Sequence, residues 1–330
     1  MRKAARNTLL IVAAVLTSLT ALAAPSATDL LRKSYESDSK AIYSGELRTS
    51  LPGQTSSQVR VLHLGPRSRM EYLSGPSEGS VIIDTGKSII SLDSRTKTAY
   101  VSNTPAPPER LDLLLANHSP VLKGSGKIAG RDCYQIRLAS KYEGNPSKTI
   151  WVDKKSYVGM KNERFSSDGR LTMSTEYTKI NYSDRPSSSS FEIPKGWQTV
   201  QLAGTDDSLE GVRKQVGFTP IKPGYVPKGY TFGGYSIQQS PGGALFAGLR
   251  YTNGLNTISV FERNKDCGGR GFGRGRGRGW MHGRGGKGSD ECMLYDPQTR
   301  MMRTTAGDIT VILVGDIAQT EMQKMADSIK

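Results

Sequence analysis

The chain has 330 residues, which at about 150 residues per domain predicts two domains and enough sequence for two hydrophobic cores. Hydrophobic residues make up 36% and charged residues 23%, so the composition excludes a wholly disordered chain. Lysines and arginines number 45 against 30 aspartates and glutamates, a formal charge of +15 that favours anionic partners such as lipid head groups, acidic protein segments or nucleic acid. Three cysteines without a Cys-x-x-Cys spacing exclude a disulfide-rich scaffold.

The first 23 residues have the features of a secretory signal peptide. Arg2, Lys3 and Arg6 precede an apolar stretch over residues 8–22, and small residues stand before the expected cleavage site at its end. The stretch is shorter than the roughly 20 apolar residues that a transmembrane helix needs. We therefore expect the signal peptide to be cleaved and the mature protein to be soluble outside the cytoplasm, in an oxidising compartment.

The chain after the signal peptide predicts helices and short strands. Ser26 and Asp29 form a capping box ahead of an apolar run, which predicts a first helix. A second helix is expected over residues 109–117, after two prolines. Alternating apolar and polar residues, bounded by turn formers and joined by connections too short for parallel crossovers, predict antiparallel strands over residues 47–50, 58–64, 69–73, 80–84, 88–92, 98–102, 127–128, 133–138, 149–153, 157–165 and 171–181.

Two helices laid against such a sheet form a half-barrel, and its interior has two interpretations. Incomplete cover leaves a dry groove of the kind that takes lipid tails, whereas complete cover gives a filled core. Apolar alternation is the same in both cases. The side chains expected to line a groove are Val59, Val61, Met70, Tyr72, Ile82, Ile90, Leu111, Leu114 and Leu115.

A composition change marks the end of the first domain, which we place at residues 24–184. Residues 185–211 are rich in serine and proline and are expected to be a linker. The second domain, residues 212–330, is expected to be smaller and also α+β. Its predicted elements are strands over residues 231–238, 245–252, 257–262, 300–305 and 309–315 and a terminal helix over residues 317–329.

Catalytic and metal-binding patterns are weak. The stretch from Gly124 to Lys127 looks like part of a phosphate-binding loop, but Ile128 follows where GxxxxGK[ST] requires serine or threonine. His63 and His118 belong to no HExxH pattern, and Cys133 is expected to be a packed thiol because no histidine partner is identifiable. We expect no enzyme, no cofactor and no metal.

Sequence features across both domains resemble the MucB/RseB family. In the first domain these are Tyr43-Ser44-Gly45, the strand Val59 to His63, the leucine-rich helix Leu111 to Leu115 and Trp151-Val152-Asp153. In the second they are Pro223-Gly224-Tyr225-Val226-Pro227, Ile258 to Glu262 and Val314-Gly315-Asp316-Ile317. The resemblance implies a LolA-like half-barrel with covering helices, followed by a smaller α+β domain.

The same resemblance implies a non-enzymatic regulator of a sigma factor that is located in the periplasm. Such a protein binds the periplasmic segment of a membrane anti-sigma factor and releases it when lipid or lipopolysaccharide-like ligands bind during envelope stress. Two alternatives remain open: a lipid or lipoprotein carrier of LolA type, and a protein that binds anionic polymers or nucleic acid. The basic charge is also compatible with peripheral contact with a membrane.

A Gly/Arg-rich insertion over residues 268–291 departs from the family. Three interpretations stay open: nucleic-acid binding, which export disfavours, contact with lipid phosphates or anionic glycolipids, and a flexible loop without a ligand. Because the insertion separates two strands of one domain, its ends are expected to lie close together and Cys267 and Cys292 to form a disulfide. The expected anion contacts are Arg270, Arg274, Arg276, Arg278 and Arg284.

Overall fold

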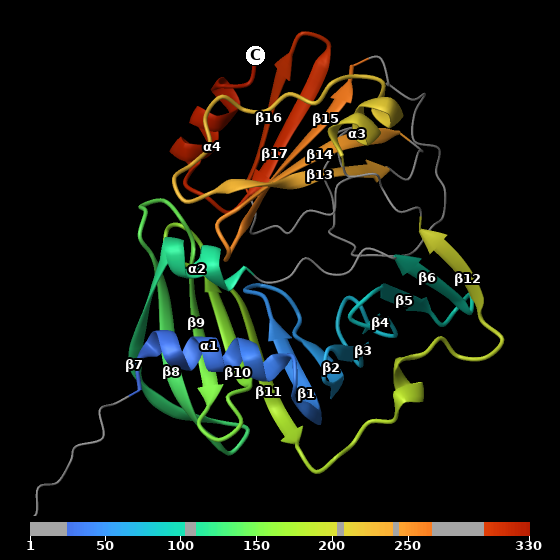
Figure 1. Ribbon diagram of the computed structural model, residues 1–330, viewed down its shortest axis with the longest axis vertical. Helices are drawn as coiled ribbons and strands as arrows, with labels where there is room; N and C mark the ends of the chain where they lie inside the picture. Colours follow the sequence, from blue (N-terminus) through green and yellow to red (C-terminus); the bar gives the residue numbers. More distant parts are fainter. Residues whose placement is uncertain (1–24, 103–109, 203–207, 240–243, 266–299) are drawn as a thin grey trace, which may run out of the picture.

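The computed structural model describes residues 25–102, 110–202, 208–239, 244–265 and 300–330, and it folds them into two sheet-based units (Figure 1). The N-terminal unit contains α1 (Ala27–Asp38), β1 (Ile42–Ser50), β2 (Ser57–Leu64), β3 (Arg67–Tyr72), β4 (Val81–Asp84), β5 (Ile89–Asp93), β6 (Thr98–Ser102), α2 (Leu111–Asn117), β7 (His118–Ile128), β8 (Arg131–Ser140), β9 (Ser147–Asp153), β10 (Gly159–Phe165), β11 (Leu171–Asn181), the 3-10 helix η1 (Ser188–Phe191) and β12 (Gln198–Leu202). The C-terminal unit contains α3 (Leu209–Val216), β13 (Thr231–Gln239), β14 (Leu245–Thr252), β15 (Thr257–Asn264), β16 (Arg300–Ala306), β17 (Ile309–Gly315) and α4 (Gln319–Asp327).

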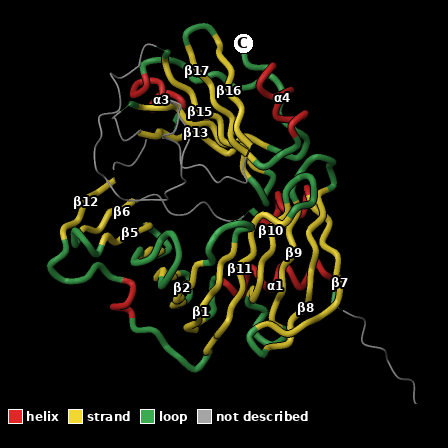
Figure 2. The backbone as a smooth tube through the Cα atoms, turned by 180° about the vertical axis from the view of Figure 1, so that it is seen from behind, coloured by secondary structure: helices red, strands yellow, loops and turns green. Residues whose placement is uncertain are grey.

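The N-terminal unit is one curved, 12-stranded sheet with strand order β12-β6-β5-β4-β3-β2-β1-β11-β10-β9-β8-β7. Neighbouring strands are antiparallel except β12, which runs parallel to β6. The helix α1 lies across one face of the sheet, in front of the strands in Figure 1 and behind them in Figure 2. The predicted fold class, an antiparallel half-barrel with covering helices followed by a smaller α+β unit, is confirmed. No helix in the described ranges is long and apolar enough to span a bilayer.

The position of α1 follows from its capping and its apolar face. The Ser26 hydroxyl accepts the backbone N–H of Asp29 at 3.0 Å, so the predicted N-cap is confirmed. Leu30 and Leu31 are buried on the inward face. They share one apolar cluster with Leu114 of α2 and with strand residues of β8 and β9, so the two helices and the sheet have a common core.

The structure differs from the expected linker over residues 185–211. Phe191 of η1 is buried against β4, β5 and β6, with Ile193 and Trp197 beside it. The following residues add β12 to the edge of the sheet. Part of this serine-rich stretch therefore belongs to the N-terminal unit, because three large apolar side chains anchor it to the sheet.

The C-terminal unit is a five-stranded antiparallel sheet with strand order β13-β14-β15-β17-β16. Its core packs Met322 and Met325 of α4 against Leu249, Val260 and other strand residues. The helix α3 was not expected from the sequence, although its ends carry ordinary signals. The Ser208 hydroxyl accepts the N–H of Gly211 at the N-cap, and Gly217 ends the helix at φ +80°.

The strands β15 and β16 flank β17 in the C-terminal sheet. Both strands pair with β17, Asn264 opposite Ile309 and Arg300 opposite Gly315. The chain therefore leaves β15 at one end of β17 and enters β16 at the other. The insertion itself, with Cys267, Cys292 and the five predicted anion-binding arginines, lies outside the described residues, so the closeness of its ends, the disulfide and the contacts stay predictions.

Candidate functional site

The side chains predicted to line a groove fall into different apolar clusters, and none of them lines the pocket described below. The groups from β2 and β3 belong to an apolar cluster with Tyr43 and Tyr177, and the leucines of α2 belong to the core beneath α1. The first group comprises Val59, Val61, Met70 and Tyr72, and the second comprises Leu111, Leu114 and Leu115.

The remaining two predicted residues lie on opposite faces of the sheet. Ile82 is directly opposite Met70 in the strand register, so it shares a face with the β2 and β3 residues. Ile90 is directly opposite Ile83, the next residue along β4, and is buried in the cluster that Phe191 covers. Successive residues of a strand alternate in direction, so Ile90 cannot line the same groove as Ile82.

A pocket with a volume of about 400 Å³ opens where α1 meets the turn between β9 and β10. Lys33 of α1 and Lys40 of the turn that follows it line the pocket together with the aromatic rings of Tyr157 and Tyr182. The Lys33 ammonium lies 4.9 Å from the centre of the Tyr157 ring. The full lining is Lys33, Glu36, Ser37, Lys40, Ala41, Ser156, Tyr157, Val158 and Tyr182. The lining therefore combines aromatic and aliphatic groups with two lysines, one glutamate and two serines.

A buried carboxylate fixes the turn that forms this wall. Asp153 is 1% exposed and accepts the backbone N–H groups of Lys155 and Ser156 at 2.7 and 2.8 Å. Burial alone would raise the pKa of Asp153, but the Arg131 guanidinium and these two N–H groups lower it below its ordinary value. Tyr157 adopts φ +60°, which is uncommon for a residue with a bulky side chain. The ionised carboxylate thus holds the Tyr157 ring in place at the pocket.

Arg131 also connects the turn to the second aromatic ring of the pocket. Its guanidinium pairs with Asp153 and lies 4.6 Å from the centre of the Tyr182 ring. The Tyr182 hydroxyl is 2.7 Å from the Ser156 hydroxyl, and burial raises the pKa of Tyr182 to about 12. Tyr182 is therefore a neutral, hydrogen-bonded ring at neutral pH.

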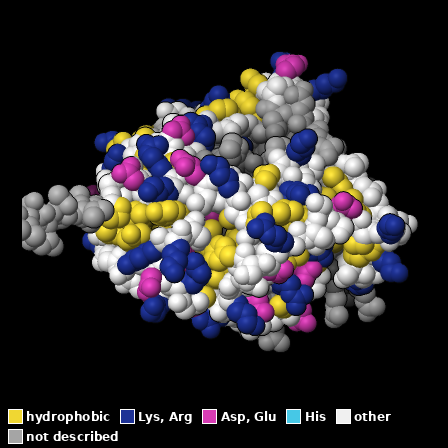
Figure 3. Space-filling view, turned by 60° about the horizontal axis from the view of Figure 1, so that its bottom comes forward, with side chains coloured by type: hydrophobic (Ala, Val, Ile, Leu, Met, Phe, Trp, Pro, Cys, Tyr) yellow, Lys and Arg dark blue, Asp and Glu magenta, His cyan; other side chains and the backbone are white. Residues whose placement is uncertain are grey.

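The face of the molecule drawn in Figure 3 carries more basic than acidic side chains. Figure 3 shows lysines and arginines distributed between apolar patches, with fewer acidic groups among them. This distribution agrees with the formal charge of +15. An anionic ligand or partner is attracted to such a surface over distances of the order of the Debye length.

The two units meet where one end of the C-terminal sheet contacts α2 and the β8–β9 loop. The turn between β14 and β15 lies against α2, and Leu255 packs on the core beneath α1. The Asn117 amide donates to the backbone oxygen of Asn253 at 3.2 Å. Gly254 has φ +87°, and a Cβ there would lie 2.4 Å from the backbone nitrogen of Leu114. Glycine is required at this position both by the backbone angle and by the close approach of α2.

Other residues that could carry out chemistry do not form a catalytic or metal-binding arrangement in the described part of the chain. The stretch from Gly75 to Gly79 matches the GxSxG pattern around Ser77, which sequence reasoning missed, but it lies in a turn between two antiparallel strands. A nucleophile elbow instead joins a strand to a helix. Cys133 is a buried free thiol, as expected, and burial raises its pKa to about 11. Within the described residues, His, Cys, Asp and Glu side chains form no group of three that could hold a metal.

Comparisons with known proteins place the chain in a family. The model of the MucB/RseB N-terminal domain matches residues 26–196, just over half of the sequence, so the chain belongs to the MucB/RseB family. No curated protein gives a significant match.

Three solved structures resemble both units. The complex structure of Pseudomonas aeruginosa MucA/MucB has 17% identity and a TM-score of 0.65, with 92% of this chain and 98% of that chain covered. MucB in complex with MucA(peri) has 18% identity, a TM-score of 0.63 and the same coverage. A structure of MucB has 16% identity and a TM-score of 0.59, with 92% and 97% covered. At these identities the likeness shows a shared fold, which extends over both units.

Proposed function

We propose that this chain is a periplasmic, non-enzymatic regulator that binds the periplasmic part of a membrane anti-sigma factor. One observation carries the proposal: the chain shares the fold of MucB over 92% of its length, and two of the MucB structures contain MucA. Family membership and the excess of positive charge, which suits an acidic segment, support it.

A binding experiment tests this function. The mature chain, residues 24–330, is immobilised and titrated with the periplasmic segments of the membrane anti-sigma factors of the source organism. We expect saturable binding of one segment, with an association rate that falls as salt is raised because salt screens the attraction between the basic surface and an acidic segment. Binding that is absent for every segment, with the chain shown to be folded by circular dichroism, would refute the function.

We further propose that the protein senses an anionic amphiphile, a lipid or lipopolysaccharide-like ligand, in the pocket between α1 and the β9–β10 turn. The volume of about 400 Å³ is within the range of small-ligand sites, and apolar atoms make up most of the surface that lines the pocket. Tyr157 and Val158 would contact an acyl chain, while Lys33 and Lys40 would neutralise the head group. These residues replace the predicted groove lining as the candidates for ligand contact.

Native mass spectrometry of the protein purified from the periplasm tests the ligand. We expect a bound acyl-chain species that is lost on denaturation. The double variant Lys33→Gln/Lys40→Gln should then retain less ligand, since both pocket cations are gone, whereas Lys123→Gln, an exposed position on β7, should behave as wild type. A ligand-free wild-type protein, or equal loss in both variants, would rule out the pocket.

A further inference from the structure

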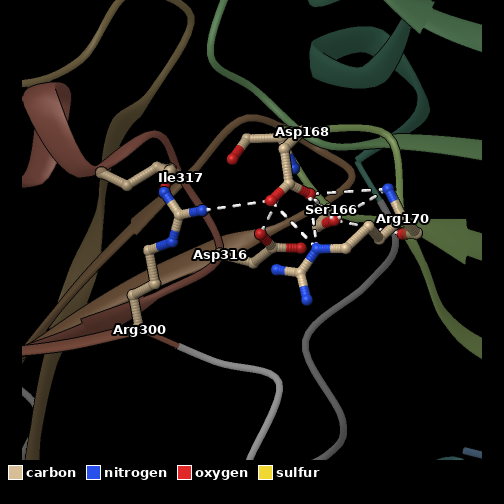
Figure 4. Close-up of polar contacts among 7 residues, drawn as sticks. Ser166, Asp168, Arg170, Arg300, Asp316 and Ile317 are labelled. Carbon is tan, nitrogen blue, oxygen red and sulfur yellow. Dashed lines mark hydrogen bonds and ion pairs between the residues drawn. The ribbon is translucent and has the colours of Figure 1, made fainter. Parts of the chain in front are cut away.

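A cluster of charged side chains closes the junction between the two units (Figure 4). Arg300, the first residue of β16, donates from Nη1 to the backbone oxygen of Ile317 at 3.0 Å, and its Nη2 lies 3.5 Å from an Asp168 carboxylate oxygen. Asp168 belongs to the loop between β10 and β11 of the other unit. The backbone N–H of Ser167 donates to Asp316, directly after β17, at 3.4 Å. Two weak polar contacts therefore cross the junction here.

Each half of the cluster is held in place by its own unit. The Ser166 hydroxyl bonds to Asp168 and accepts the N–H of Arg170, and the Arg170 Nε lies 3.0 Å from Asp168. The Ser166 hydroxyl and the Arg170 guanidinium lower the pKa of Asp168 to about 2, so the carboxylate stays ionised. Arg300 is held by the Ile317 oxygen. Both partners are thus positioned whether or not they contact each other.

The two ends of the junction differ in burial. At α2, Asn253 is fully buried and Asn117 is 5% exposed. In the charged cluster the side chains of Asp168 and Arg300 are 43% and 27% exposed. A loop contact also crosses the junction, in which the N–H of Ala318 donates to the oxygen of Gly144 at 2.8 Å. The charged cluster is therefore the end of the junction that is more exposed to solvent and salt.

We propose that the Asp168–Arg300 pair is a releasable latch that sets how firmly the exposed end of the junction is closed, while the turn at residues 253–256 stays packed on α2. An ion pair of this exposure changes an equilibrium by only about two- to fivefold. The latch therefore adjusts the population of loosened junctions and does not lock the units together. A role of the latch in partner release rests on the proposed function. Partner binding changes the latch only if the partner binds the closed and the loosened junction with different affinities.

Hydrogen exchange of the mature chain, followed by mass spectrometry, tests the latch. In Arg300→Ala and in Asp168→Asn, we expect exchange of residues 166–170 and 316–318 to accelerate by about two- to fivefold, with residues 113–117 and 253–256 unchanged. Raising salt should produce the same local acceleration in the wild type. The control Arg303→Ala changes an exposed arginine on the same strand, directed to the other face of the sheet, and should have no such effect.

The outcomes separate the latch from the function. Unchanged exchange in both latch variants, or acceleration that is equal at both ends of the junction, would overturn the latch. If the wild type binds an anti-sigma segment and both latch variants bind it with unchanged affinity, the regulatory role is overturned. If the wild type binds no segment, the proposed function fails, while the exchange result still decides the latch.

Discussion

At the residue scale, the buried carboxyl of Glu262 is the least expected feature of the C-terminal unit. Glu262 is fully buried on β15, and its Oε2 accepts the backbone N–H of Ile221 at 2.9 Å. Its Oε1 has no hydrogen-bond partner within the described part of the chain. Burial raises the pKa of Glu262 to about 7, and the Ile221 N–H opposes the rise. A sequence pattern does not show this, since position 262 completes an alternating strand in which an apolar residue would fit.

The buried carboxyl predicts an unusual dependence of stability on pH. The unfolded pKa is near 4.5 and the folded pKa about 7, so the folded state binds more protons between these values. The contribution of Glu262 to stability is complete below pH 4.5, falls as pH rises to about 7, and is constant above. The test is urea unfolding of wild type and Glu262→Gln at pH 5 and pH 8. The free energy of unfolding of the variant minus that of wild type should be roughly 2–3 kcal/mol larger at pH 8 than at pH 5.

The control for this measurement is Glu143→Gln, an exposed carboxyl in the β8–β9 loop. It should leave the difference between the two pH values unchanged. A wild type and a Glu262→Gln variant with parallel pH profiles would show that the buried carboxyl does not titrate in this range.

At the element scale, the sequence predicts strands with one buried face well and the two edge strands of the N-terminal sheet, β7 and β12, poorly. Strands such as β2, β8 and β15 alternate because one face is buried, and that alternation is visible in the sequence. Only the last residues of β7 were expected, because Pro120, Lys123 and Gly124 occupy its first part and such residues are tolerated at sheet edges. In β12 every residue is exposed, so no periodic signal exists.

Phe191 is predicted to be the anchor that holds η1 and β12 on the sheet. Phe191→Ala should cost about 3–5 kcal/mol locally, because a buried ring is removed from the cluster on β4 to β6. The expected result is faster tryptic cleavage after Lys195, measured on the folded protein. Leu202→Ala, at a side chain 47% exposed on β12, is the matched control and should be cleaved like wild type. Equal cleavage of Phe191→Ala and wild type would mean that other contacts hold the segment.

At the scale of the whole molecule, two units and a family resemblance could be predicted, but their junction could not. The contacts between the units join residues far apart in the chain, such as Asn117 with Asn253 and Asp168 with Arg300. Each of these side chains resembles an ordinary surface or turn residue in the sequence. The pocket was missed for a similar reason, since its wall combines one face of α1 with a turn whose shape depends on Asp153.

Gly254 provides a test of the junction. Gly254→Ala should destabilise the protein by more than about 1 kcal/mol, because the new Cβ adds a clash with the Leu114 backbone to the cost of a positive φ. Gly53→Ala is the matched control, with φ +76° and nothing within 4 Å of its Cβ. Thermal unfolding of both variants compares the two effects. Equal losses of stability in the two variants would mean that α2 moves away from the new Cβ without a cost in free energy.

The path of the chain between β15 and β16 has a consequence for the speed of folding. The strands β16 and β17 form a hairpin joined by a short turn at Gly307, so their pairing closes only a small loop. The pairing of β15 with β17 has to close a loop that contains all of residues 265–308, and the entropy of loop closure grows with length. The hairpin should therefore form early and dock onto β15 late, and shortening the Gly/Arg-rich insertion should accelerate docking without changing the hairpin.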